Sequence, residues 1–113
     1  MNDPALMDWM IDRELPIEVC PTSNVQTGAA SSIAAHPIRA LWRSGVSLSF
    51  HTDNRLISRT SASREAALLV IDAGLTWADL QRMSLLAAQA SFLPDHVKGP
   101  ALSRIQSWPC PDA

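Results

Sequence analysis

The segment Ser49-Phe50-His51-Thr52-Asp53-Asn54-Arg55-Leu56 decides how the chain is interpreted, because an apolar run ends there in a cluster of polar side chains. The run from Val46 to Phe50 is typical of a short buried strand. Polar side chains at the carboxyl end of a buried parallel strand are where α/β folds place their chemistry. Because side chains alternate along a strand, we expect His51 and Asp53 to point the same way, and Asn54 to point away unless the strand has already ended. The spacing is compatible with three roles: the imidazole and carboxylate bind a metal, orient one another, or only cap the following helix.

Composition places the chain among ordinary globular domains. It has 113 residues, 47% of them hydrophobic and 18% charged, which is enough for one domain. The net charge of -2 gives no indication of a nucleic-acid or anionic-membrane partner. We expect no membrane span and no signal peptide, and therefore a cytoplasmic chain with reduced cysteines. Cys20 is expected to be a small buried side chain, and Cys110 to lie in a frayed tail.

Helix and strand signals alternate along the first half of the chain, and helix signals fill the second half. Alternation of this kind indicates parallel strands joined by crossover helices. The signals predict a helix from Asp3-Pro4 to Pro16, a strand at 17–20, a helix from His36-Pro37 to Gly45, a strand at 46–50, and helices at 62–73, from Trp77 and from Pro94.

Several local features carry specific expectations. Pro21 to Asn24 should break the first strand and open a small polar loop that reaches Ser32 and lines a site. A second loop should reach Thr60. His36 precedes a proline and is expected to flank the helix cap.

Thr76 and Asp79 have the spacing of a capping box, and Leu80, Met83, Ala87 and Ala90 should form a core face. His96 should be solvated, and Gly99-Pro100 should weaken the last helix.

Two strands are too few for a stable sheet, which usually needs about three or more. Both predicted strands look buried on each side, so they require neighbours that this chain does not supply. The sequence therefore predicts a slice of a larger α/β fold.

Four blocks of the sequence resemble the adenosine deaminase family, in the order and spacing of that family. Cys20-Pro21-Thr22-Ser23-Asn24-Val25-Gln26-Thr27-Gly28 is similar to its Cys-Pro-x-Ser-x-x-x-Thr-Gly block, and Ser47 to Asn54 to its Ser-Leu-x-Thr-Asp-Asp block. The other two matches are His36-Pro37-Ile38 and Ala90-Ser91-Phe92-Leu93-Pro94. The resemblance covers about 3–105, so residues 1–113 are expected to form one partial deaminase domain with a tail at 106–113.

The resemblance implies the C-terminal part of a (β/α)8 TIM barrel, about the last two β/α units, in an incomplete barrel. Complete barrels need about 250 residues. The family is zinc-dependent, and zinc lowers the pKa of bound water to about 7, which supplies the attacking group for C6 of the purine. Asp53 matches the family's metal-binding aspartate. The family's histidine ligands, its proton-donating glutamate and its basic histidine would all lie upstream, so the chain holds no catalytic residue of its own. The smaller zinc deaminases use His-x-Glu and Pro-Cys-x-x-Cys signatures, and neither is present.

Three further positions follow from the resemblance. Asn54 stands where many members have an aspartate that hydrogen-bonds purine N7, and an amide can donate there without being protonated first. Ser23 is expected to line the same pocket. His51 stands where the family commonly has asparagine. We expect it either to lie next to the metal-binding aspartate without binding the metal itself, or to have no effect on the site.

Three hypotheses remain open at this stage. The chain is the C-terminal part of a zinc-dependent adenosine deaminase, acting on a purine nucleoside and inactive alone. Alternatively, it is a non-catalytic remnant that binds a nucleoside or pairs with a complementing barrel chain. Or it belongs to a deaminase of a related aminopurine such as adenine.

Overall fold

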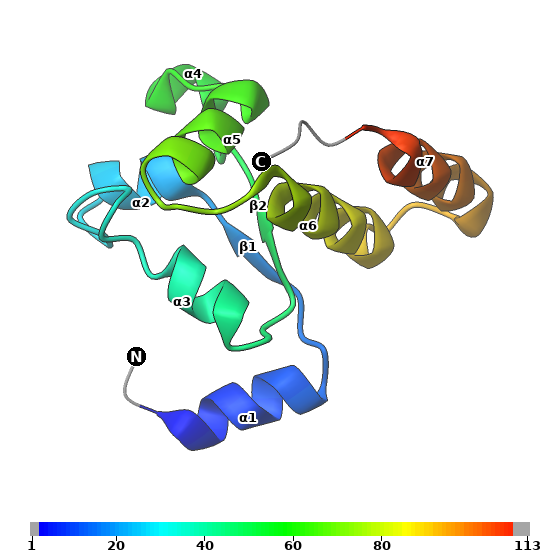
Figure 1. Cartoon of the computed structure of the whole chain (residues 1–113), viewed down its shortest axis with the longest axis horizontal. Coiled ribbons are helices and arrows are strands. Elements are labelled where there is room, and N and C mark those ends of the chain that lie inside the picture. Colours follow the sequence, from blue (N-terminus) through cyan, green and yellow to red (C-terminus); the bar gives the residue numbers. More distant parts are fainter. Residues whose placement is uncertain (1–2, 110–113) are drawn as a thin grey trace.

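The computed structural model describes residues 3–109, which form two short parallel strands surrounded by helices (Figure 1). The predicted α/β order is confirmed. In chain order the elements are α1 (Pro4–Asp12), β1 (Ile17–Val19), α2 (Pro21–Gln26), α3 (Ile38–Arg43), β2 (Leu48–Phe50), α4 (Arg55–Ser58), α5 (Ala62–Ile71), α6 (Trp77–Ala90) and α7 (Asp95–Ser107).

The sheet pairs β1 with β2 in parallel, with Ile17 opposite Leu48 and Val19 opposite Phe50. Both strands are shorter than the apolar runs that predicted them. Val19 and Leu48 belong to a hydrophobic core built from the strands and from α3, α5 and α6, and Ile17 and Phe50 pack against it. The fully buried members Ile38, Leu69 and Met83 come from these three helices. The core therefore lies between one face of the sheet and the helices that follow each strand.

Two short helices replace loops that were expected from the sequence. The first strand ends before Pro21, as expected, but Pro21 begins α2 and not a loop, because proline suits the first helical position, where its missing N–H is not needed. Asn54 caps α4, and its Oδ1 accepts hydrogen bonds from the backbone N–H groups of Leu56 and Ile57 at 3.1 and 3.2 Å. Both loop predictions were wrong at these points for the same reason: the helices are too short to show an apolar period.

The C-terminal helices form a pair in which α7 packs on α6 (Figure 1). The predicted capping box of Thr76 and Asp79 is confirmed at the start of α6. Leu80 and Met83 are buried as expected, whereas Ala90 at the end of the predicted core face is exposed.

The last helix continues through Gly99-Pro100 to Ser107, although a proline cannot donate within it. Some carbonyl groups at its C-terminal end accept hydrogen bonds from α6. The Nε2 atom of Gln81 on α6 donates to the carbonyl oxygens of Ile105 and Trp108 at 2.8 and 3.0 Å. His96 is exposed, as predicted.

Within residues 3–109, the sheet has no third strand, so β1 and β2 each present one unpaired edge. Several large apolar side chains are also exposed, among them Leu56, Ile57 and Phe92. Barrels have no free strand edges, so this open sheet fits the prediction of an incomplete barrel. No helix within 3–109 has the length and apolar character that a membrane span requires.

Candidate metal and substrate site at the strand ends

Asp53 lies just beyond the carboxyl end of β2, in a turn between the strand and α4. The strand ends at Phe50, and Asp53 adopts a left-handed backbone conformation with φ of 48°. The regular alternation of side chains therefore stops before Asp53, and the expectation that His51 and Asp53 share a strand face loses its basis. A non-glycine residue with positive φ is uncommon and is often found at functional sites. The Asp53 side chain is exposed.

Ser23 connects this carboxylate to the end of the other strand. It lies on α2, directly after β1, and is buried, and its Oγ donates to Oδ2 of Asp53 at 2.5 Å. Hydrogen bonds from a hydroxyl to a carboxylate are short and stronger than neutral ones. Because the two strands are parallel, their carboxyl ends meet at one edge of the sheet and bring residues 23 and 53 together. The sequence placed both residues near one pocket but did not predict this bond.

The oxygen and the nitrogen of the Asn54 side-chain amide have different roles. Its Oδ1 is occupied in capping α4, which fixes the orientation of the amide. Within residues 3–109 its Nδ2 has no hydrogen-bond partner, and the side chain is exposed beside Asp53. The free half of the amide is therefore a donor.

His51 forms its side-chain hydrogen bond with Ser49, on its own strand. Nε2 of His51 lies 2.7 Å from Oγ of the buried Ser49. This pair leaves Asp53 with Ser23 as its side-chain partner among residues 3–109.

Cys20 lies beside the same turn and carries a free thiol, whereas Cys110 falls outside the described residues. Burial raises the pKa of the Cys20 thiol, and the negative charge of Asp53 raises it further. A hydrogen bond with the Asp53 backbone acts in the opposite direction but does not reverse the shift. The sulfur is therefore held as a neutral thiol, which is a poor metal ligand and nucleophile.

Sequence reasoning missed Glu65, the buried group that holds this region together. It lies on α5 and is fully buried. Its Oε2 accepts from the backbone N–H of Thr22 at 3.1 Å and its Oε1 from the Thr60 hydroxyl at 2.5 Å. Glu65 thereby ties the first turn of α2, which carries Ser23, to the segment after α4. The available signal was its place one turn before the core residue Leu69.

His36 holds the other end of the segment that follows α2. Its Nδ1 accepts from the backbone N–H of Ile38 at 3.0 Å, so the prediction that His36 flanks the helix cap is confirmed. Its Nε2 lies 3.0 Å from Oδ1 of Asn24, the residue after Ser23. This arrangement requires a neutral ring that carries its proton on Nε2. Burial lowers the pKa of His36, which favours the same neutral form.

The residues of this chain do not form a metal site by themselves. Among residues 3–109, no three His, Cys, Asp or Glu side chains are grouped so that they could hold an ion. Catalytic zinc takes about three protein ligands. Asp53 fits as one such ligand, since one carboxylate oxygen is fixed by Ser23 and the group faces solvent.

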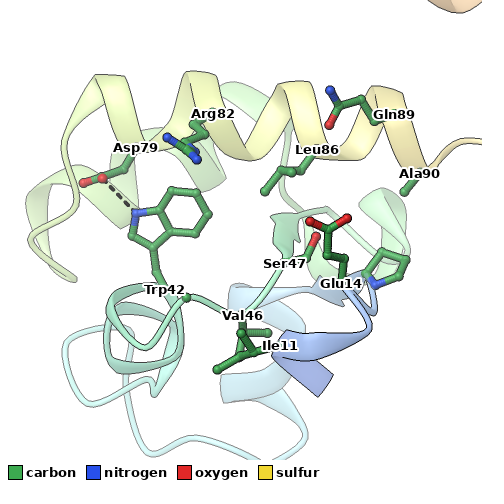
Figure 2. A pocket seen from close by; sticks show the side chains of 12 residues that line it. Ile11, Glu14, Trp42, Val46, Ser47, Asp79, Arg82, Leu86, Gln89 and Ala90 are labelled. Carbon is green, nitrogen blue, oxygen red and sulfur yellow. Dashed lines mark hydrogen bonds between the residues drawn. The ribbon is translucent and has the colours of Figure 1, made fainter. Parts of the chain in front are cut away.

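A groove with a volume of about 720 Å³ lies at the opposite, amino-terminal end of the strands. Figure 2 shows Trp42 and Asp79 at its wall, where the indole N–H donates to Oδ1 of Asp79 at 2.8 Å. Ser23, Asp53 and Asn54 do not line it.

Two parallel strands joined by crossover helices, with polar groups at their carboxyl edge, are the arrangement of a sector of a β/α barrel. Comparison with solved structures supports this fold. The chain superimposes on an adenine deaminase from Arthrobacter aurescens with a TM-score of 0.90 and 21% identity, covering 96% of this chain and 33% of that one. It also superimposes on an N6-methyl-AMP deaminase from Arabidopsis with a TM-score of 0.78 and 32% identity, covering 89% and 31%.

The chain belongs to the adenosine deaminase family, which matches residues 1–108. An adenosine deaminase of Mycobacteroides abscessus is 47% identical over 89 residues, which are 79% of this chain and 25% of that protein. One from Mycobacterium sp. (strain KMS) is 48% identical over 83 residues. The chain thus spans about a quarter of the length of these relatives.

Proposed function

We propose that this chain supplies the C-terminal part of the active site of a zinc-dependent adenosine deaminase. The parent reaction is the hydrolytic deamination of adenosine or deoxyadenosine to inosine or deoxyinosine, in purine salvage. The observation that carries the proposal is the Ser23–Asp53 pair at the strand ends, with the donor half of Asn54 beside it. On its own the chain is inactive, because its described residues hold one ligand of the several that catalytic zinc requires.

In this proposal each of the three residues has a separate task. Asp53 gives one carboxylate to the zinc ion, which when bound supplies an activated water at neutral pH. Ser23 donates to Oδ2 and fixes the rotation of the carboxylate. Orientation of a ligand by a neighbouring hydrogen-bond donor typically contributes about 10- to 100-fold to metal affinity or activity.

Asn54 recognises the purine through its amide N–H group. Purine N7 is an acceptor, and the capping of α4 leaves the amide nitrogen of Asn54 as the group available to a ligand. An amide donates at any pH, whereas a carboxylate in that position would have to be protonated. His51, bonded to Ser49, acts from behind the ligand and does not touch the metal.

A second candidate is deamination of a related aminopurine. The N6-methyl-AMP deaminase of Arabidopsis, 32% identical to this chain, makes a 6-substituted purine nucleotide the specific alternative. Adenine remains an option of the same class. A non-catalytic remnant that binds a nucleoside would keep the Asn54 contact but not the zinc.

The test is a deaminase assay on the purified chain with added zinc, which follows the loss of adenosine absorbance. We expect no turnover above the buffer control. The same assay is then repeated with the remaining barrel units supplied by a relative, with adenosine, adenine and N6-methyl-AMP as substrates. Clear turnover by the chain alone would refute the assignment of the missing ligands to other units.

A further inference from the structure

Glu65 is an acidic residue of α5 that is completely buried. Acidic side chains are almost never fully buried unless they are paired, because their transfer out of water is costly. Among residues 3–109 the carboxyl group forms no ion pair, and its two oxygens accept hydrogen bonds from Thr22 and Thr60. An apolar residue of similar size would avoid the cost of burial. What the carboxyl group adds is a fixed position for two donors from different parts of the chain.

The first of these donors belongs to α2. Thr22 is the second residue of this helix, and the first N–H groups of a helix have no partner within it. Cys20, the residue before the helix, makes no capping hydrogen bond with its side chain. Oε2 of Glu65 accepts from the Thr22 N–H at 3.1 Å and so acts as the cap from a distant part of the chain. Ser23 comes next, so the turn that directs its Oγ to Asp53 is held by Glu65.

The second donor belongs to the segment that carries Asp53. This segment, residues 53–60, begins with the positive φ of Asp53 and ends at the buried Thr60, directly after Arg59, which also has positive φ. Residues other than glycine keep such a conformation only where the surrounding structure fixes it. The Thr60 hydroxyl donates to Oε1 of Glu65 at 2.5 Å. The far end of the segment is therefore fixed by the same carboxyl group that fixes α2.

We propose that Glu65 is a positioning residue for the metal-binding carboxylate of Asp53. One side chain sets the distance between α2 and the 53–60 segment, and this distance places Oγ of Ser23 on Oδ2 of Asp53. Glu65 acts through Ser23, because its own hydrogen bonds go to the residue before Ser23 and to the end of the segment. The role in zinc binding rests on the proposed function, whereas the coupling of Glu65 to the Ser23–Asp53 bond does not.

A further contact between the same two elements allows Glu65 to be changed without separating them. Nε2 of Gln26 on α2 donates to the carbonyl oxygen of Ser58 on α4 at 3.3 Å. We therefore expect α2 and α4 to stay together when the Glu65 acceptors are removed. The change should be a loss of alignment between Ser23 and Asp53.

The first experiment needs no metal and uses a double-mutant cycle in the full 113-residue chain. Glu65→Leu removes both acceptors and keeps most of the volume. Ser23→Ala should lower the urea midpoint of the unmodified chain, and its effect should fall to about half or less in the Glu65→Leu chain, where the bond to Asp53 is already misaligned. Leu69→Ala, one turn further along α5 in the core, is the control. It should destabilise the chain and leave the effect of Ser23→Ala unchanged.

Thr60→Val is the second variant and keeps the test valid if the Glu65→Leu chain does not fold. It replaces the hydroxyl that donates to Glu65 by a methyl group of similar shape. The effect of Ser23→Ala should be reduced in this chain as well.

The second experiment measures zinc affinity in a continuous barrel, in which this chain replaces the matching segment of the Mycobacteroides abscessus adenosine deaminase. Chelator competition is carried out at a temperature at which every variant is folded. We expect Glu65→Leu to weaken zinc binding about tenfold or more, as loss of a group that orients a ligand does. Glu65→Gln should stay within about threefold, since an amide can bond to both threonines. Leu69→Ala should bind zinc like the unmodified barrel.

Fully additive effects of Ser23→Ala in the Glu65→Leu or Thr60→Val chain would overturn the inference. Equal losses of zinc affinity in Glu65→Leu and Leu69→Ala would overturn it too, because Glu65 would then act only through general stability. Coupling of Glu65 to Ser23 in a barrel that binds no zinc would support the positioning of Asp53 and refute the proposed function.

Discussion

The Oγ atom of Ser23 lies 2.5 Å from Oδ2 of Asp53, so a residue that follows β1 fixes the carboxylate that follows β2. The two residues are 30 positions apart in the chain. The bond exists because parallel pairing of two strands brings their carboxyl ends together. Loss of this hydrogen bond should therefore lower the folding stability of the isolated chain and weaken zinc binding in the assembled site.

Ser23→Ala should lower the free energy of unfolding of the isolated chain by about 1 kcal/mol, because Asp53 is exposed and regains water when the bond is lost. Urea unfolding followed by circular dichroism measures the change. Thr52→Ala is the control, since that hydroxyl donates to the Asp53 carbonyl and not to its carboxylate. In the complex with the remaining units, Ser23→Ala should lower the zinc content measured after dialysis, whereas Thr52→Ala should not.

Glu65 should tolerate one substitution and not another. Glu65→Gln keeps an acceptor for the Thr22 N–H, and its amide can donate to the Thr60 hydroxyl, so the cost should be about 1 kcal/mol. Glu65→Ala leaves both groups without a partner and opens a cavity, and should cost about 3 kcal/mol or more. Chemical denaturation of the two variants checks the order. Equal destabilisation would mean that Glu65 acts through its volume and not through its two hydrogen bonds.

Local sequence signals predicted most of the helices, because the residues that begin and end a helix can be recognised in the sequence. Asp3-Pro4 caps α1, and Asp3 indeed accepts from the N–H of Leu6 at 3.0 Å. Gly45 and Gly74 have positive φ and follow α3 and α5, as residues that end helices do. These features depend on a few neighbouring residues, so they can be recognised without a tertiary structure.

The sequence predicted which residues belong to the candidate site, but it did not predict the hydrogen bonds that hold them in place. Asp53, Asn54 and Ser23 were found by family resemblance, and their roles stay proposals. The Glu65 network was not foreseen because it depends on contacts across 43 positions, and an acidic residue in a helix normally faces solvent. The turn at Asp53 was missed because a positive φ at a non-glycine residue leaves no mark on the sequence.

The pH dependence of stability should contain a contribution from His36. Burial lowers its pKa in the folded chain, so between the folded value and the unfolded value of about 6.5 the unfolded state binds more protons. Stability is then complete above about pH 6.5 and falls as the pH decreases below it. Protonation would also remove the Nδ1 acceptor for the Ile38 N–H.

Comparison with His36→Asn isolates this contribution, because asparagine offers an acceptor to Ile38 but does not titrate. Urea unfolding of both proteins between pH 7.5 and 5.5, about the range in which histidine titrates, gives the difference directly. We expect the unmodified chain to lose more stability over this range than the variant. Identical slopes would show that His36 does not contribute to the pH dependence of stability.

Asp79 should contribute to the pH dependence of folding stability in the acid range. Burial acts to raise its pKa, but hydrogen bonds from the Thr76 backbone, the Trp42 indole and the Thr76 hydroxyl, with the charge of Arg43, bring it below its usual value. The unfolded carboxyl, with a pKa of about 3.9, binds its proton first as the pH falls. The stabilisation is therefore present above about pH 4 and is lost as the pH falls through the lower folded value.

Asp79→Asn should cost about 1 kcal/mol near neutral pH, because the amide cannot accept at both oxygens from Thr76 and Trp42. The cost should shrink in acid, where the unmodified carboxyl is itself protonated. Asp95→Asn is the control, since Asp95 lies in the first turn of α7 and is exposed. Thermal unfolding at neutral and acid pH measures both variants. A cost for Asp79→Asn that stays constant with pH would show that the indole and cap bonds do not depend on the charge of the carboxylate.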